Sequence, residues 1–351
     1  MKPLIIGDLV AKVPVIQGGM GVGVSRSSLA TAVAKAGGVG IISGVHVGYD
    51  EDDFEKNTLN ANLRALKKHI TKAKENCLGG IIGVNLMVAM NNYEEHVNQA
   101  ISSGVDLIIS GAGLPMKLPS LIKNTNVKIA PIVSTSKAAS VILKMWDRKE
   151  KMTADLIVVE GPKAGGHLGY TRNELETVTV DDYDKEFEKI LQIAKSYSEK
   201  YNKEIPVVAA GGIYNGDDVA KYINLGASGV QVGTRFVATH ECDADEKFKN
   251  TYINSSKNDI NIVTSPVGMP GRAIKNKFIE RVSISRPKIT KCYDCLIPCN
   301  PKNTPYCISE ALINAVKGDI DNALLFCGEN AYKVDRLYSV DEVIQELTCK
   351  L

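Results

Sequence analysis

The stretch PVVAAGGIYNGDDVAKYINLGASGVQVGT, residues Pro206–Thr234, shows the repeating unit of the fold. It contains two short apolar runs, Pro206–Ala210 and Gly229–Val232, and each is followed directly by a glycine turn. Neither run alternates polar and apolar side chains, a pattern typical of parallel strands that are buried on both faces. The residues between the runs carry helical signals, so the stretch predicts a strand–helix–strand unit.

Six further runs of the same character precede this unit. They are rich in Val and Ile and comprise Val13–Gln17, Val39–Ser43, Ile81–Leu86, Val105–Ser110, Lys128–Val133 and Ala154–Glu160. Eight strand candidates with intervening helices favour a closed barrel over an open, doubly wound sheet. We therefore predict an α/β protein whose residues 1–240 form a TIM (β/α)8 barrel, the core of which takes about 250 residues in a typical case.

The alternation of strands and helices ends near Arg235, and residues 241–351 are expected to form an accessory segment packed on the barrel. This C-terminal extension is helical and contains a cysteine patch at 292–307. We expect helices at Ile308–Val316 and from Ser339 onward, where Ser339 and Glu342 form a capping-box pattern. At the other end of the chain, Ser25 is expected to cap the first barrel helix.

Glycines gather where the predicted strands end. They occur as Gly18-Gly19, Gly111, Gly165-Gly166, Gly211-Gly212 and Gly233, which Thr234 follows. Glycine allows a ligand to lie directly on backbone N–H groups. The loops after strands seven and eight of a barrel often hold a phosphate, so these turns predict a phosphate-bearing flavin across the barrel mouth.

Composition excludes several classes of partner. Lys and Arg number 42 against 40 for Asp and Glu, a net charge of +2 that gives no argument for nucleic acid or an acidic membrane surface. No run of about 18 apolar residues predicts a membrane span, and the N-terminus lacks the pattern of a signal peptide. We expect a cytoplasmic enzyme with a small-molecule substrate; the oligomeric state stays open, a homodimer included.

The cysteine patch has the spacing of a metal site. Four thiols lie within sixteen positions, at Cys292, Cys295, Cys299 and Cys307. Thiolates at such spacing suit Zn²⁺ or an iron–sulfur cluster, although the pattern matches neither a zinc ribbon nor a ferredoxin run. Reduced thiols in a compact loop are the alternative.

Several motifs together resemble the nitronate monooxygenase (2-nitropropane dioxygenase) family over about residues 10–280. The matching segments are Pro14–Gly21, which includes Met20, then Ala36–Gly40, Gly83–Asn85, Ala164–Gly169, Ala209–Ile213 and Val230–Phe236. The resemblance implies an FMN-dependent oxidoreductase, related to the FMN-dependent enoyl-ACP reductases. The family usually carries an acidic residue just before the Ala-Gly-Gly-His run, and Lys163 occupies that place here, which puts the substrate in doubt.

His167, in the sixth loop, is the candidate catalytic residue. The resemblance implies that it is a base or a substrate-orienting group, and a near-neutral imidazole suits either role. At strand ends, Gln17, Asn85 and Gln231 can pair with the flavin through their carboxamides, as can the Ser134 hydroxyl. Among the other histidines, His46 could reach the barrel mouth, whereas His69 and His96 lie in polar helical stretches and are expected to be solvated.

Three functions remain open from the sequence. The first is FMN-dependent oxidation of alkyl nitronates or nitroalkanes. The second is an NAD(P)H-dependent reductase of enoyl-ACP, enones or quinones on the same fold. The third is a non-catalytic flavin- or metal-binding sensor that uses the cysteine patch. Fold alone cannot separate them.

Overall fold

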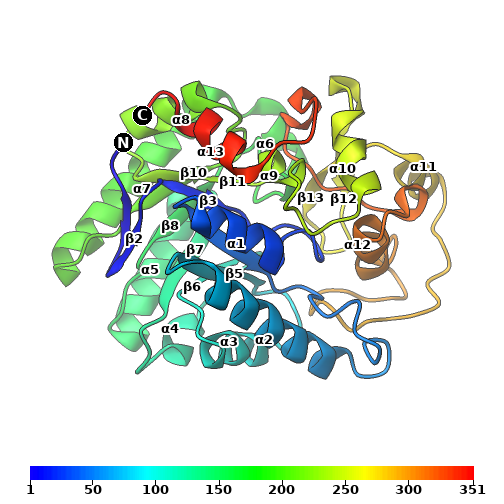
Figure 1. Ribbon diagram of the computed structural model, residues 1–351, viewed down its shortest axis with the longest axis horizontal. Helices are drawn as coiled ribbons and strands as arrows, with labels where there is room; N and C mark the ends of the chain where they lie inside the picture. The colour runs from blue at the N-terminus through cyan, green and yellow to red at the C-terminus, as the bar shows by residue number, and fades with distance from the viewer.

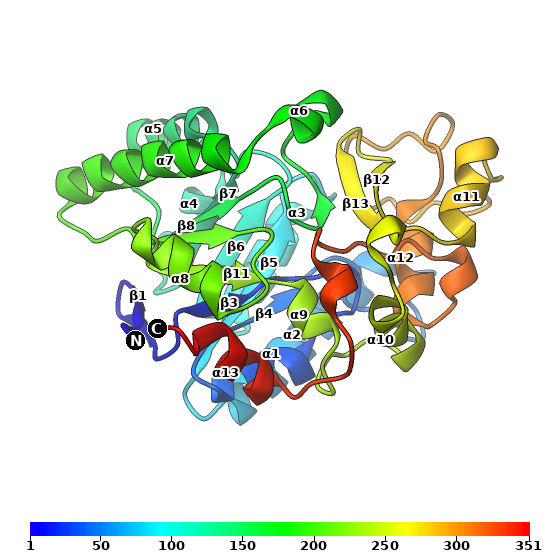
Figure 2. The same cartoon turned by 90° about the horizontal axis from the view of Figure 1, so that it is seen from above.

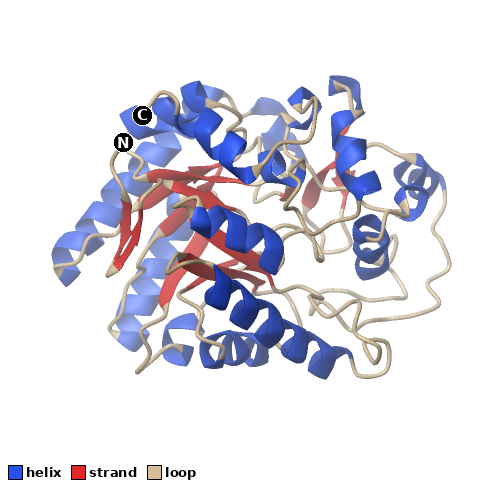
Figure 3. Cartoon of the chain, in the orientation of Figure 1, coloured by secondary structure: helices blue, strands red, loops and turns tan.

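The computed structural model describes residues 1–351, and eight parallel strands close into a barrel in the order β10-β11-β3-β4-β5-β6-β7-β8. The predicted TIM-barrel fold is confirmed (Figure 3). The barrel strands are β3 Val15–Gln17, β4 Val39–Ser43, β5 Ile81–Met87, β6 Leu107–Gly111, β7 Lys128–Val133, β8 Ile157–Glu160, β10 Val207–Ala210 and β11 Gly229–Val232.

All eight predicted strands are present, and the differences lie at their ends. The largest is in β8, which was expected from Ala154 and begins at Ile157. Just before that start, the side chain of Asp155 accepts a hydrogen bond from the backbone N–H of Ile129 at 2.8 Å. The backbone N–H of Asp155 also donates to the Ile129 carbonyl at 3.0 Å, so one residue makes both bonds to β7 just before the regular strand begins.

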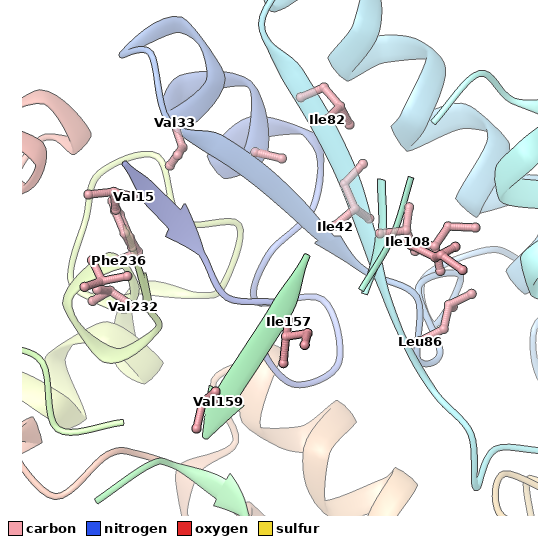
Figure 4. Packing of buried hydrophobic residues seen from close by; sticks show 14 of the residues in the cluster. Val15, Val33, Ile42, Ile82, Leu86, Ile108, Ile157, Val159, Val232 and Phe236 are labelled. Carbon is pink, nitrogen blue, oxygen red and sulfur yellow. The ribbon is translucent and has the colours of Figure 1, made fainter. Parts of the chain in front are cut away.

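Helices surround the barrel and cover the outer faces of its strands (Figure 1). They are α1 Ser27–Lys35, α2 Thr58–Asn76, α3 Tyr93–Ser102, α4 Leu118–Leu121, α5 Ser136–Glu150, α7 Val180–Tyr201 and α8 Gly216–Asn224, with α6 Arg172–Thr177 in the connection after β8. Figure 4 shows the outer cluster between the two layers, where Ile42, Ile82 and Ile108 point from the strands and Val33 from α1. The strands read as continuous apolar runs because this outer face is buried as well as the inner one.

An N-terminal hairpin, which the sequence did not predict, closes the bottom of the barrel. It pairs β1 (Leu4–Ile6) with β2 (Leu9–Ala11) in antiparallel register. Leu4, Ile6 and Ala11 pack in one buried cluster with inward-facing strand residues such as Ile16 and Val158. The hairpin therefore extends the interior core.

Most of the rest of the chain gathers at the opposite end of the barrel (Figures 1 and 2). The elements there are α9 Thr234–Val237, α10 Glu246–Ile253, η1 Lys257–Asp259, β12 Ile260–Thr264, β13 Pro270–Ile274, α11 Lys277–Ile284, α12 Ile308–Val316, η2 Ile320–Asn322 and η3 Ala331–Lys333, and the last helix of the chain is α13 Val340–Thr348. The expected helix at 308–316 and the Ser339–Glu342 capping box are confirmed. None of the helices combines the length and apolar composition that crossing a bilayer requires.

The chain finally returns to the side of the barrel. Helix α13 packs against α8 and α1, so it closes the helical ring between the last and the first barrel units. In both views the two termini lie side by side. The division at residue 240 stays a prediction.

The expected Ser25 cap of α1 was wrong. The Ser25 hydroxyl accepts instead from the backbone N–H of Met20 at 3.0 Å. The start of α1 is capped by Asp243, whose carboxylate accepts from the N–H groups of Arg26, Ser28 and Leu29 at 2.8, 3.2 and 3.1 Å. A residue of the C-terminal segment thus supplies the hydrogen-bond acceptor for the N–H groups at the start of the first barrel helix.

Candidate functional site

A cavity of about 640 Å³ opens at the carboxyl ends of the strands. This volume lies within the range of small-molecule sites. All predicted cofactor and catalytic residues except Gln17 line it: Gly18, Gly19, Met20, Asn85, Gly111, Ser134, Gly165, Gly166, His167, Gly211, Gly212, Gln231, Gly233 and Thr234. The structure therefore brings together residues that are spread over more than 200 positions of the chain.

Gln17 differs because its carboxamide is used within the barrel. Its Oε1 accepts from the backbone N–H of Ile41 at 3.0 Å, and its Nε2 donates to the carbonyl of Gly18. The side chain is fully buried and does not line the cavity. In this arrangement Gln17 joins two neighbouring strands.

Other polar groups of the cavity are free to meet a ligand. The Oε1 atom of Gln231 is buried and has no hydrogen-bond partner in the chain. Asn85 packs directly on Gly19, where a Cβ atom would lie 2.4 Å from that of Asn85. Glycine at 19 therefore lets the Asn85 side chain pack directly against the backbone. A buried acceptor that has no partner in the chain suits a polar edge of a ligand such as a flavin ring.

The turns after β10 and β11 present free backbone donors. The N–H groups of Gly211, Gly212, Ile213 and Gly233 donate to no backbone carbonyl. Gly211 and Gly212 have φ values of +92° and +80°, which L-residues with a side chain rarely adopt. Such a set of unpaired N–H groups is suited to phosphate oxygens, so these residues fit the phosphate end of FMN.

His167 is held by a small sheet outside the barrel. Gly166 and His167 form β9, which pairs antiparallel with β13 in the sheet order β12-β13-β9. The His167 Nε2 atom lies 2.6 Å from the Ser265 hydroxyl, and its ring meets Phe326 edge-on at 5.0 Å. Burial lowers the pKa of His167 to about 4, so the imidazole is neutral at physiological pH.

Two further histidines line the cavity, and one was misjudged from the sequence. His96 was expected to be solvated, but it is buried; its Nδ1 lies 2.7 Å from the Asn92 carbonyl and its Nε2 has no partner. His46 is also buried, with Nε2 2.8 Å from the Ser309 hydroxyl. The expectation for His69 was wrong too, since it is only partly accessible and its Nδ1 lies 3.0 Å from the Ser27 hydroxyl. For His96 and His69 the polar composition of the surrounding helix was misleading, because a polar helix can still turn one face inward.

Lys163 lines the cavity, but its charge is paired. Its Nζ lies 3.4 Å from the Glu329 carboxylate, and its side chain packs on Gly212. Glu329 comes from the C-terminal segment. A free positive charge at this place is therefore absent.

The cysteine patch forms no metal site in this structure. No group of three or more His, Cys, Asp and Glu side chains is placed to hold a metal ion. Cys292, Cys295, Cys299 and Cys307 are free thiols, and the first two line the cavity. The Zn or iron–sulfur prediction is therefore unsupported.

Sequence reasoning missed several residues that the C-terminal segment contributes. Phe326, Gly328 and Asn330 line the cavity. The Gly328 N–H donates to the Thr234 hydroxyl at 2.9 Å, and the Asn330 side chain donates to the Gly212 carbonyl at 2.7 Å. The only sequence signal was a glycine and an asparagine close together in Phe326–Ala331.

Comparisons with known proteins agree with this geometry. A family model described as nitronate monooxygenase matches residues 2–350. A probable nitronate monooxygenase of Staphylococcus aureus (strain Newman) is 29% identical, with 77% of each chain covered. The (3aS,4S,5R,7aS)-5-hydroxy-7a-methyl-1-oxo-octahydro-1H-indene-4-carboxyl-CoA dehydrogenase of Rhodococcus jostii (strain RHA1) is 27% identical over 78% of this chain, which spans only 65% of that protein. The solved structure of FabK from Thermotoga maritima superposes with a TM-score of 0.71 at 25% identity, covering 97% of this chain and 93% of that one.

Proposed function

Because the chain belongs to the nitronate monooxygenase family, whose members are FMN-dependent oxidoreductases, we propose that it oxidises alkyl nitronates. In this proposal the free N–H groups of Gly211, Gly212 and Gly233 hold the FMN phosphate. Asn85, Ser134 and Gln231 hold the flavin ring. The bound FMN supplies the redox chemistry, while the chain supplies binding, orientation and exclusion of water.

The observation that carries the proposal is the state of His167. A histidine with a pKa of about 4 is a weak base at neutral pH, so it is poorly suited to deprotonate a neutral nitroalkane. A nitronate is already the carbanion-equivalent anion and needs no base. In this proposal the Ser265 hydroxyl donates to Nε2 of neutral His167, so the ring proton is on Nδ1 and this N–H can donate to a nitronate oxygen. His167 therefore acts as an orienting group, and the nitronate form is the substrate.

The test is anaerobic mixing of the FMN-loaded protein with propyl-2-nitronate, followed by absorbance near the flavin band. Bleaching by the nitronate, with far slower bleaching by neutral 2-nitropropane, is the expected result. His167→Asn should slow bleaching by the nitronate while FMN stays bound. Equal rates with both nitro compounds, or an unchanged rate in H167N, would contradict the role of His167.

A second candidate is an NAD(P)H-dependent reductase of enoyl thioesters. One observation favours it, namely the likeness to a dehydrogenase whose name specifies a carboxyl-CoA thioester. The wall of the cavity is also apolar in about half of its residues, 31 of 61. Rapid anaerobic bleaching by NADH or NADPH, with none by the nitronate, would establish this reading instead.

A further inference from the structure

The cavity is also lined by a carboxyl group that has no role in the proposed function. Glu160 is the last residue of β8 and lines the cavity. Along β8, Val158 packs in the interior cluster of the barrel and Val159 in the outer cluster. Because side chains alternate along a strand, Glu160 faces the barrel interior at its open end.

Glu160 stands level with Gln231 in the barrel register. Ala210 pairs with Glu160 on one side and with Gln231 on the other. Only the small side chain of Ala210 separates the two polar side chains in this row. One neighbour of this alanine is thus a carboxyl group, and the other is a carboxamide whose Oε1 atom has no partner in the chain.

No positive charge faces Glu160. The titratable groups around it are Tyr170, from the connection after β8, and Tyr183, from α7. Both hydroxyls donate to backbone carbonyls, Tyr170 to that of Glu160 at 3.3 Å and Tyr183 to that of Val159 at 3.1 Å. Burial raises the pKa of both phenols, so both are neutral.

The nearby loop does not supply a charge either. Lys163 is paired with Glu329, and His167 is neutral at physiological pH. Arg272 of β13 donates to the Pro162 carbonyl at 2.9 Å, and its guanidinium lies 3.9 Å from the same Glu329 carboxylate. Burial alone raises the pKa of the Glu160 carboxyl to about 8. At pH 7 the group is therefore mainly a neutral carboxylic acid, which can donate a hydrogen bond.

Glu160 and Gln231 form a complementary pair for a flat heterocycle. A flavin ring carries carbonyl acceptors and an N–H donor on its pyrimidine edge. The neutral Glu160 carboxyl offers a donor, and the unpaired Gln231 Oε1 atom offers an acceptor. We propose that Glu160 is a flavin-binding residue whose carboxyl group donates a hydrogen bond to the ring. This inference rests on the proposed FMN site but does not depend on which substrate is oxidised.

The proposal predicts a pH-dependent affinity for the cofactor. If only the protonated form of Glu160 binds the ring, the Kd for FMN is flat below pH 8 and rises up to tenfold per pH unit above it. The measurement is a fluorescence titration of the apoprotein with FMN from pH 6 to 9.5. A parallel titration with riboflavin removes any contribution from the phosphate group.

Glu160→Gln is the deciding variant, because its carboxamide stays neutral and keeps an N–H donor. We expect its Kd at pH 7 to stay within about threefold of wild type and the rise above pH 8 to disappear. Glu160→Leu, with an unchanged thermal midpoint, should bind FMN at least tenfold more weakly at pH 7; if it does not fold, E160Q alone decides. A rise that persists in E160Q, or a wild-type Kd that does not change with pH, would overturn the proposal. Absence of FMN binding at every pH would instead refute the proposed cofactor site.

Discussion

Ser265 holds its side-chain oxygen 2.6 Å from Nε2 of His167, although 98 residues separate the two in the sequence. Ser265 lies in the turn between β12 and β13, and β13 pairs with the strand that carries His167. The small sheet therefore fixes both the position of the imidazole and the hydrogen bond at one of its nitrogens. The other ring nitrogen, Nδ1, makes no hydrogen bond within the chain.

Replacing Ser265 by Ala should lower kcat/KM for alkyl nitronates about fivefold, because a net hydrogen bond of about 1 kcal/mol that orients the ring is lost. The Kd for FMN should not change, since Ser265 does not line the cavity. Steady-state kinetics and FMN titration measure the two effects. Ser265→Thr keeps the hydroxyl and should restore most of the rate. Equal kinetics in S265A and wild type would show that the bond does not orient His167.

The barrel could be predicted from sequence because its strands are buried on both faces and read as apolar runs without any long-range information. The cavity could be predicted for a related reason, since glycines at strand ends all meet at one end of a parallel barrel. The pairing of β9 with β13 could not be predicted. It joins two-residue and five-residue strands whose register is fixed only in the folded chain.

The predictions that were wrong concern contacts between residues that are far apart in the sequence. Ser25 has the residue type of a helix cap, but Asp243, 217 residues from Arg26, takes that role. His96 lies among polar residues, yet its helix turns it toward the cavity. The cysteine spacing indicated ligands of the right type, but spacing alone does not place them around a metal.

The Asp243 cap gives a prediction for stability. Asp243→Ala leaves three N–H groups at the start of α1 without an acceptor, and we expect a loss of about 1–2 kcal/mol in the free energy of unfolding. Urea denaturation measures the loss, and hydrogen exchange should show faster exchange at Ser28 and Leu29. The matched control is Asp245→Ala, which removes the cap of α10. If α1 exchanges equally fast in both variants, the cap does not hold the barrel helix.

The glycine turn after β10 gives a prediction for cofactor binding. Gly212→Ala introduces a side chain at a φ of +80°, where its Cβ would lie 2.8 Å from that of Lys163. The turn must shift, so FMN should bind at least tenfold more weakly, whereas riboflavin, which lacks the phosphate, should bind almost as before. Gly226→Ala, at a φ of +107° in the turn before β11, is the control for backbone strain alone. An equal loss of FMN affinity in both variants would mean that strain, and not the phosphate contact, is responsible.

The buried histidines predict a loss of stability in acid. Burial lowers the pKa of His46 from 6.5 to about 4, and that of His167 likewise. Between those values the unfolded chain binds protons that the folded chain does not, so stability falls as pH decreases from about 6.5 toward 4. Each such histidine adds a slope of roughly 1 kcal/mol per pH unit near pH 5. Urea denaturation at pH 7, 6 and 5 should therefore show a smaller slope for His46→Gln than for wild type, while the same change at the exposed His240 should leave it unaltered. Identical slopes for H46Q and wild type would mean that His46 can take up a proton within the fold, through opening of the cavity wall at Ser309.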